Sequence, residues 1–307
     1  MSPNDLAASV RQRLLNRAKK RGDDFQLVLT WYGIERLLYR LSASPHADAF
    51  ILKGAMLFSL WSGEAHRPTR DLDLLGSGDA RVSRMEEVMR EVCQVPCDDG
   101  LEFDPASVRG EEIRSPDEYD GVRIKLVGRL AGARILLQVD ICFGDAVVPP
   151  PENIEYPSLL GLPAPRLRAY PREVVVAEKV QALVQLGMAN TRMKDFYDLW
   201  MLARQFDFEG ERLGQAIAAT FERRRTPIPA EAPLALTSEF HGNAAKQTQW
   251  RAFLRRGSVA EAAELATVVE LIAAFVMPSA AAARAGDAFA SRWQKGGPWK
   301  HASPTTP

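Results

Sequence analysis

Cysteine is scarce in this chain, and the three that occur are Cys93, Cys97 and Cys142. They form neither an even disulfide set nor a CxxC pair, so no disulfide framework is expected. Cys93 and Cys97 share a helix face without other clustered ligands, which favours small core residues over a metal site. Because no signal-like apolar segment follows Met1 either, we expect a reduced, cytoplasmic location.

An excess of charge of either sign is also missing. Lys+Arg and Asp+Glu both total 39, which gives a formal net charge of +0. This balance argues against a coat protein for nucleic acid and against a membrane-surface binder, so any nucleic-acid partner would have to be bound locally. Two basic clusters, residues 11–21 and 223–225, are candidates for contacts with an RNA backbone, and solvated helix faces explain them equally well.

Long hydrophobic runs and histidine motifs are absent too. The longest apolar stretch, residues 265–277, is interrupted by Glu270 and falls short of a membrane span, so it is expected to be a buried helix. The chain has four histidines and no HExxH or paired-histidine spacing, which argues against a histidine-based metal site. His66, in a basic loop, is expected to be solvated rather than bound to phosphate.

The composition that remains is that of a globular protein. The chain has 307 residues, 46% hydrophobic and 25% charged, which suits one large or two smaller domains. Strand and helix patterns alternate in the first half, and helical spacing dominates the second half. The expected helices are residues 4–21, 30–44, 55–61, 82–93, 173–187, 194–206, 211–225 and 259–275. The expected strands are residues 50–54, 69–76, 121–130 and 133–144, the last two forming a hairpin that turns at Ala131 and Gly132.

The boundary between the two halves is marked by proline. Residues 149–171 are proline-rich and lack periodicity, which predicts a connector and not a further element of a sheet. We therefore expect an α/β fold in two domains. Residues 1–150 would hold N-terminal helices and a core with a small mixed sheet, and residues 151–307 a helical domain. The tail after Ser279 turns small and polar, so its last residues are expected to be frayed.

Two acids stand in an otherwise apolar strand pattern, in the segment RDLDLLG of residues 70–76. Residues i and i+2 of a strand point to the same face, so Asp71 and Asp73 present their carboxylates side by side. The two like charges repel, and Mg²⁺ relieves that repulsion because it prefers oxygen ligands. The pair is interpreted as a metal platform, with solvated acids at a strand end as the alternative.

A third acid, Asp140, lies in the strand pattern LLQVDICFG. A metal-assisted phosphoryl-transfer site generally uses another carboxylate from a neighbouring strand, and Asp140 is the candidate. The hairpin turn at residues 131 and 132 would place Asp140 opposite Arg123, with Lys125 on the same face. These basic side chains suit metal-bound phosphates, and a plain cross-strand ion pair between Arg123 and Asp140 is the alternative.

Phosphate contacts are expected at the end of the strand that precedes this pair. A glycine at the end of a strand lets a phosphate approach the backbone N–H groups that follow, and a small next residue keeps that surface open. The following loop adds basic side chains and a hydroxyl. The residues expected to contact phosphate are Lys53, Gly54, Ala55, Arg67, Thr69 and Arg70.

Five segments follow one another in the order of one known family: LKGAMLFSLW, RPTRDLDLL, VDICFGD, AEKVQALV and RMKDFYDLW. Over residues 30–205 the chain resembles the AbiEii/AbiGii-type nucleotidyltransferase toxins, members of the DNA polymerase beta-like nucleotidyltransferase superfamily. One DxD pair is a weak signal, whereas five ordered segments are specific. The chain departs from the family pattern at Ala55, where a residue of the glycine or serine type is more usual. Because alanine has no hydroxyl group, this departure concerns a hydroxyl contact to the nucleotide phosphate and does not concern the metal site.

The resemblance implies a nucleotidyltransferase core followed by a helical domain, and a set of roles. A nucleotide donor would be held by Gly54, and Mg²⁺ or Mn²⁺ by Asp71 and Asp73. Lys179 of the AEK segment would reach the triphosphate. Asp195 of KDFYD matches an essential family acid, and Asp198 shares its helix face, so either could act.

The reaction implied is an attack by a hydroxyl on the α-phosphate of an NTP, with pyrophosphate leaving. The family resemblance implies transfer to the 3′ end of tRNA by the toxin of a bacterial toxin–antitoxin pair with a phage-defence role, and hence an antitoxin partner. A protein or aminoglycoside-like hydroxyl as acceptor, and a catalytically idle NTP- or RNA-binding module, are the rival hypotheses. Surface ion pairs are the alternative explanation of Lys179, Asp195 and Asp198.

Overall fold

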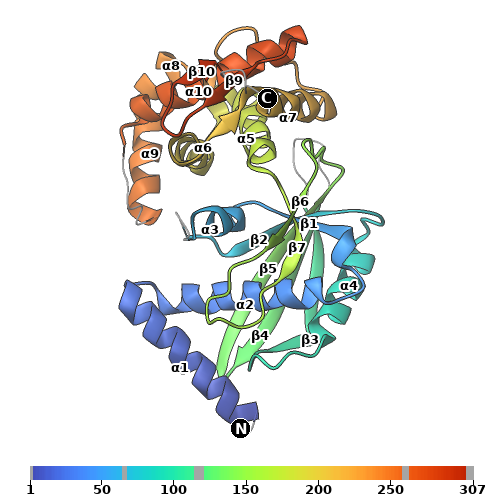
Figure 1. Cartoon of the computed structure of the whole chain (residues 1–307). Helices are drawn as coiled ribbons and strands as arrows, with labels where there is room; N and C mark the ends of the chain where they lie inside the picture. The colour runs from blue at the N-terminus through green and yellow to red at the C-terminus, as the bar shows by residue number, and fades with distance from the viewer. Residues whose placement is uncertain (1–2, 64–67, 114–120, 258–262, 302–307) are drawn as a thin grey trace, which may run out of the picture. The chain divides into compact units, whose positions relative to one another are not determined.

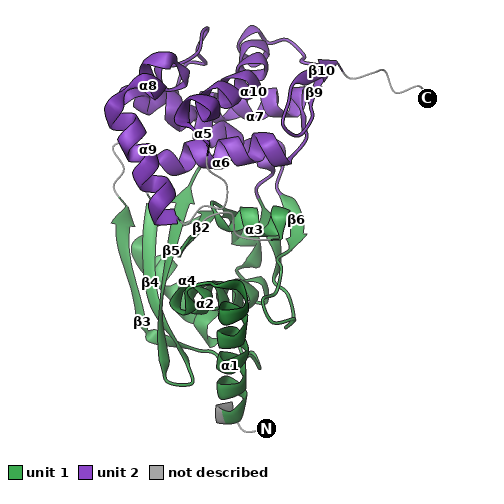
Figure 2. Ribbon diagram, turned by 90° about the vertical axis from the view of Figure 1, so that its left-hand side faces the viewer, with its two compact units in different colours: residues 1–144, 152–169 green, residues 145–151, 170–307 purple. Residues whose placement is uncertain are grey.

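The computed structural model describes residues 3–63, 68–113, 121–257 and 263–301 (Figure 1). The chain divides into two compact units (Figure 2). Unit 1 comprises residues 1–144 and 152–169, and unit 2 comprises residues 145–151 and 170–307. The chain therefore passes from one unit to the other three times.

Unit 1 is built on a seven-stranded mixed sheet with the strand order β3-β4-β5-β2-β1-β7-β6. The β5/β2 and β1/β7 pairs are parallel and the other neighbours are antiparallel. The helical elements are α1 (Pro3–Arg21), α2 (Phe25–Ser42), η1 (Ala47–Ala49), α3 (Met56–Ser62) and α4 (Val82–Gln94). The strands are β1 (Phe50–Lys53), β2 (Asp71–Gly76), β3 (Glu102–Ile113), β4 (Gly121–Leu130), β5 (Ala133–Phe143), β6 (Glu152–Glu155) and β7 (Arg166–Ala169).

Helix α2 lies across one face of this sheet, as Figure 1 shows. The residues of β5 that point to this face are buried, namely Ile135, Leu137, Val139 and Ile141. Gly33 of α2 allows the close approach, because a Cβ at this position would lie only 3.0 Å from Cδ2 of Leu137. The alternate residues of β5, which include Asp140, therefore point to the opposite face.

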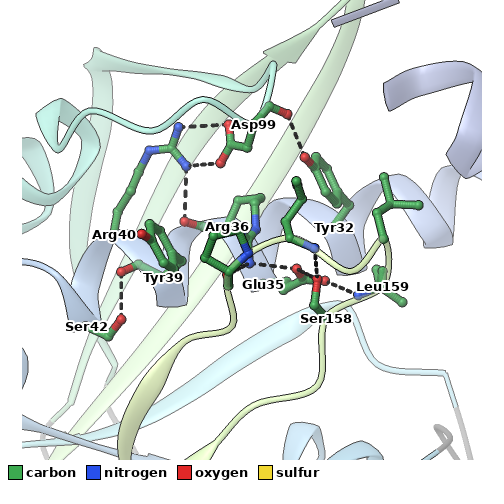
Figure 3. Close-up of polar contacts among 12 residues, drawn as sticks. Tyr32, Glu35, Arg36, Tyr39, Arg40, Ser42, Asp99, Ser158 and Leu159 are labelled. Atoms are coloured by element: carbon green, nitrogen blue, oxygen red, sulfur yellow. Dashed lines mark hydrogen bonds and ion pairs between the residues drawn. The ribbon is translucent and has the colours of Figure 1, made fainter. Parts of the chain in front are cut away.

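Polar side chains of α2 hold two loops of unit 1 in place (Figure 3). The Glu35 carboxylate accepts hydrogen bonds from the Ser158 hydroxyl at 3.0 Å and from the Leu159 backbone N–H at 2.8 Å. Arg40 donates two bonds to the Asp99 carboxylate, at 2.7 and 3.1 Å. These groups are buried, so their bonds offset the cost of removing charge from water.

The predicted hairpin is confirmed. Strands β4 and β5 pair from Leu130↔Ala133 at the turn to Gly121↔Cys142, and Arg123 stands opposite Asp140 as expected. Helix α2 begins five residues before the expected start at Thr30, because Asp24 caps it by accepting a hydrogen bond from Leu27 N.

The expectation that residues 149–171 only connect two domains is wrong. They contain β6 and β7, and β7 pairs in parallel with β1 through Ile51↔Arg168 and Leu52↔Ala169. Strand β3 was not predicted either, although it forms one edge of the sheet. It contains Pro105 and an irregular register between Asp104 and Arg109, which break the alternation that a strand pattern needs.

Unit 2 is mainly helical, as expected. Its helical elements are α5 (Arg172–Leu186), η2 (Gly187–Ala189), α6 (Met193–Gln205), α7 (Gly210–Arg223), η3 (Leu234–Leu236), α8 (Ser238–Gly242), α9 (Ala244–Gly257) and α10 (Leu265–Ala285). A small antiparallel sheet adds β8 (Phe208–Glu209), β9 (Ser291–Trp293) and β10 (Trp299–His301). Ordered structure thus continues well beyond Ser279, and the expected fraying of the last residues falls on 302–307, outside the described part of the chain.

Helix α10 contains the longest apolar stretch of the sequence. By length and composition it is the one helix in the described ranges that could cross a membrane. In unit 2 it packs against α6 and α7, and its buried residues include Val268, Ile272 and Phe275. This packing is that of a core helix, as the sequence predicted.

Candidate active site

The two acids of β2 lie side by side on one face of the strand. Asp71 is exposed and Asp73 is partly buried, whereas Leu72 between them is fully buried on the other face. The strand register places Asp73 between Lys53 of β1 and Asp140 of β5. The sheet therefore brings four of the predicted charged residues together in unit 1.

Gly54 lies directly against Asp73. Its φ of +76° belongs to the left-handed region, and a Cβ at this position would lie 2.0 Å from Oδ2 of Asp73. Only glycine accommodates both the backbone conformation and the neighbouring carboxylate. Glycine is thus required at position 54 because its missing side chain leaves space for Asp73, an acid of the site. Sequence reasoning did not predict this contact.

Asp140 is held by Arg123 in a bidentate ion pair. Nε and Nη2 of Arg123 donate to Oδ1 and Oδ2 of Asp140, both at 2.8 Å, and Nε2 of Gln138 donates to Oδ2 at 3.2 Å. The hydrogen bonds from Arg123 to Asp140, with the charges of Asp140 and then Asp71, raise the pKa of the Arg123 guanidinium further above its usual range. The cross-strand ion pair that the sequence left open is therefore present. Lys125 is engaged separately, by Glu111 at 2.8 Å.

Two of the three predicted metal ligands, Asp71 and Asp73, are suitably placed to hold a divalent cation. Within the described residues no three side chains of the His, Cys, Asp or Glu type are gathered to hold a metal ion. Asp71 and Asp73 nevertheless supply two neighbouring carboxylates, and Mg²⁺ is commonly held by one or two carboxylates together with substrate phosphates and water. Both oxygens of Asp140 are already bound to Arg123. The residues present thus fit a cation held by two acids and a bound triphosphate, not a preassembled three-acid site.

The loop before β2 is fixed by a residue that the sequence analysis did not identify. Nε1 of Trp31 in α2 donates to the carbonyl oxygen of Thr69 at 3.0 Å, which fixes the backbone two residues before Asp71. Arg70 is exposed. Arg67, a predicted phosphate contact, and His66, which was expected to be solvated, lie outside the described residues. Ala55 precedes the first turn of α3 and makes no side-chain cap.

A second charged cluster lies in unit 2. Nζ of Lys179 in α5 contacts Oδ1 of Asp195 at 2.8 Å and Oδ2 of Asp198 at 2.7 Å. The two acids are three residues apart in α6, so they share the helix face that packs toward α5. Their side chains are 1% and 0% exposed, against 15% for Lys179. Both acids therefore contact the lysine, and the alternative of a solvated surface ion pair is wrong.

Two arginines of unit 2 form further ion pairs with buried or partly buried acids. Nε of Arg192 lies 2.8 Å from Oδ2 of Asp195. The sequence offered this pair as one of the possible ion pairs of Asp195, because Arg192 lies three residues before the acid. Arg224, from the basic cluster 223–225, pairs with Asp145 at 3.1 Å and Glu178 at 3.5 Å. The central residue of that cluster is thus committed to acidic partners within unit 2.

Two solved structures from Helicobacter pylori are similar to this chain. One, described as a candidate nucleotidyltransferase, is 13% identical, with a TM-score of 0.46 and coverage of 82% of this chain and 91% of the other. The second, JHP933, is 14% identical, with a TM-score of 0.46 and coverage of 82% and 88%. A search of curated proteins found no match.

The family comparison is the informative one. The model of the nucleotidyl transferase AbiEii toxin family, of type IV toxin–antitoxin systems, matches residues 36–275. The match spans both units and includes Gly54, the acids of β2, and Lys179 with its two partners. The chain therefore belongs to the AbiEii nucleotidyltransferase toxin family.

Proposed function

We propose that this protein transfers a nucleoside monophosphate from an NTP to a hydroxyl at the 3′ end of tRNA, and that it acts in the cytoplasm as the toxin of a toxin–antitoxin pair. The observation that carries the proposal is the pair of neighbouring carboxylates on β2, Asp71 and Asp73, with Gly54 packed against Asp73. The acceptor and the phage-defence role are supported only by what family membership implies.

The cation would be Mg²⁺ or Mn²⁺, held by Asp71 and Asp73 together with the phosphates of the nucleotide. When bound, it would neutralise charge on the triphosphate and stabilise the attacking and leaving oxygens. Asp140 holds Arg123 in place on the next strands through its bidentate ion pair. Arg123 would then offer the remaining edge of its guanidinium to a phosphate. Lys53, opposite Asp73, would partly offset the charge of the two acids.

Lys179 is the proposed cation for the triphosphate in unit 2. Asp195 and Asp198 contact its ammonium group from α6 and are buried, so they act as positioning residues for Lys179. A lysine held in this way loses less side-chain entropy when it binds phosphate. Arg192, paired with Asp195 and partly exposed, balances the second carboxylate.

The bond changes are those of an in-line displacement. The acceptor oxygen forms a bond to the α-phosphorus and releases its proton, while the bond from that phosphorus to the oxygen bridging the α- and β-phosphates breaks. Pyrophosphate leaves with that bridging oxygen. Thr69, Arg70 and Lys125 are proposed to contact the phosphates, as the sequence predicted.

The test is incubation of the purified protein with Mg²⁺, total tRNA and each α-labelled NTP in turn. Wild type should label tRNA, and Asp71→Asn should abolish labelling while leaving the melting temperature close to that of wild type. Asp79→Asn is the matched control, because Asp79 is an exposed acid that pairs only with nearby Arg81 among the described residues. This variant should keep full activity.

Each other outcome would overturn part of the proposal. Label on protein, or on a small-molecule alcohol added to the assay, would keep the chemistry and replace the acceptor. No turnover with any acceptor would favour a module that only binds NTP or RNA. Equal activity of Asp71→Asn and wild type would refute the role of the β2 acids.

A further inference from the structure

Positive charge is concentrated on α1, although the whole chain has a formal net charge of +0. Between Leu6 and Gly22 there are six basic residues and no acidic one. They are Arg11, Arg13, Arg17, Lys19, Lys20 and Arg21, and we call them the basic face of α1. This helix lies before residues 36–275, which the family model matches, so the basic face is a feature of this chain and not of the matched family region.

The inner side of α1 is already occupied. Val10, Leu14 and Ala18 are spaced four residues apart and are almost fully buried, and α1 packs against α2 and β4. The basic residues occupy the remaining surface, where all except the partly buried Arg17 are exposed. The helix therefore presents charge to solvent and has no second apolar stripe to offer.

The basic face is poorly neutralised by the protein. Arg21 pairs with Asp23 at 3.3 Å. Arg13 donates to the carbonyl oxygen of Leu160 at 2.6 Å, and in the described ranges neither it nor Arg17, Lys19 or Lys20 has an ion pair with an acid. The spacing of Arg13, Arg17 and Lys20 places like charges next to one another on the helix surface, which destabilises an isolated helix. The helix dipole compensates only in the last turn, after Arg17.

An anionic partner would relieve this repulsion, and a phosphodiester backbone fits better than a lipid surface. Arg13 to Lys20 span about 10 Å along the helix, a length over which a nucleic-acid strand presents several phosphates. A helix that lies on a membrane buries an apolar face in the lipid. The apolar face of α1 is buried against α2 and β4 instead.

Contacts within unit 1 limit the distance between the basic face and the proposed active site. A short turn joins α1 to α2, and Trp31 of α2 holds Thr69, two residues before Asp71. The path from Arg21 to Asp71 through these contacts is at most about 40 Å, which corresponds to about twelve base pairs of a duplex. An RNA bound to α1 could therefore reach Asp71 with one of its ends.

We propose that the basic face of α1 binds the phosphates of the acceptor RNA and holds its body while the 3′ end occupies the active site. This inference rests on the proposed function, because it assumes an RNA acceptor. It adds a binding surface that lies outside the catalytic residues.

The test compares two triple variants in the full-length protein. The first is Arg17→Gln/Lys19→Gln/Lys20→Gln, and the second is Arg251→Gln/Arg255→Gln/Arg256→Gln on α9. Both remove three positive charges near the end of a helix, and glutamine has a helix propensity similar to that of lysine and arginine. Circular dichroism would establish that both variants remain folded.

Affinity for unfractionated tRNA would be measured from 50 to 200 mM salt, together with transfer of label to tRNA. Loss of three phosphate contacts should reduce the slope of log affinity against log salt by about 2 to 3. At 50 mM salt the α1 variant should bind at least about tenfold more weakly than wild type and need correspondingly more tRNA for half-maximal transfer. The α9 variant should match wild type.

Other results would overturn the inference in distinguishable ways. If wild type transfers label to tRNA and the α1 variant binds tRNA equally well, the surface is wrong and the proposed function stands. An equal loss in both variants would mean that only total charge matters. If wild type neither binds nor labels tRNA, the RNA acceptor of the proposed function falls together with this surface. Binding of wild type to anionic lipid vesicles through α1, in place of tRNA, would replace RNA by a membrane.

Discussion

Replacement of Gly54 by alanine tests the packing at the centre of the proposed site. The residue has a φ of +76°, and a Cβ would come within 2.0 Å of Oδ2 and 2.6 Å of Cγ of Asp73. The variant would therefore suffer two separate penalties, one from its backbone conformation and one from the neighbouring carboxylate. Asp73 would have to move away from its position on β2.

A second glycine separates the two penalties. Gly63, which ends α3, has a φ of +75°, and no atom of the described residues lies within 4 Å of a Cβ placed there. Gly63→Ala should cost only the left-handed conformation, about 1–2 kcal/mol. Gly54→Ala should cost that amount plus about 1–3 kcal/mol for the crowded site. The difference between the variants isolates the contact with Asp73.

The assays are urea unfolding and labelling of tRNA from an α-labelled NTP. We expect Gly54→Ala to have the lower free energy of unfolding and to lose transfer activity, because Asp73 is displaced. Gly63→Ala should keep its activity. Equal stability of the two variants, or full activity of Gly54→Ala, would refute the argument that glycine is required by the acid beside it.

Three further predictions concern charge and ionisation. Lys179→Ala should lower the free energy of unfolding by about 3–5 kcal/mol and raise the NTP concentration needed for transfer, since it removes the ammonium group that two buried carboxylates share. The exposed Lys125→Ala, a control for stability only, should cost less than about 1 kcal/mol, and a similar loss of stability in both variants would contradict this reasoning. Burial raises the pKa of Glu35 above its ordinary 4.5, so the folded state binds the proton of this carboxyl more tightly than the unfolded state does. The melting temperature of wild type should therefore fall relative to that of Glu35→Gln as the pH rises through and above 4.5. A difference in melting temperature that does not change with pH would exclude the pKa shift. Burial also raises the pKa of the Cys93 thiol to about 12, so iodoacetamide at pH 8 should alkylate it far more slowly in folded than in unfolded protein, as mass spectrometry would detect.

Much of the sheet was predictable because its signals are local. The alternation in β5 and the turn at Ala131 and Gly132 determine the register, and the register places Asp140 opposite Arg123. Strands β6 and β7 have four residues each, and no period can be recognised in so short a segment. Strand β7 takes its place in the sheet by pairing with β1, about a hundred residues earlier in the chain, and β6 by pairing with β7.

The candidate site was predictable to the same extent. The two-residue spacing of Asp71 and Asp73 predicts a shared face, and the three-residue spacing of Asp195 and Asp198 does the same for a helix. Spacing along one element does not determine what packs against it. Sequence reasoning therefore missed the contact between Gly54 and Asp73 and the burial of both acids of α6.

The chain crosses between the two units three times, and this limits where the protein could be cut into fragments that keep their structure. A fragment that ended at residue 150 would lose β6 and β7, and it would expose the edge of β1 beside the acids of the site. It would also lose Ser158 and Leu159, which satisfy the buried carboxylate of Glu35. A single crossover between β5 and β6 therefore cannot exchange unit 2 for a relative's without breaking the sheet of unit 1, whereas a crossover directly after β7 would leave that sheet intact and retain only residues 145–151 of the original unit 2.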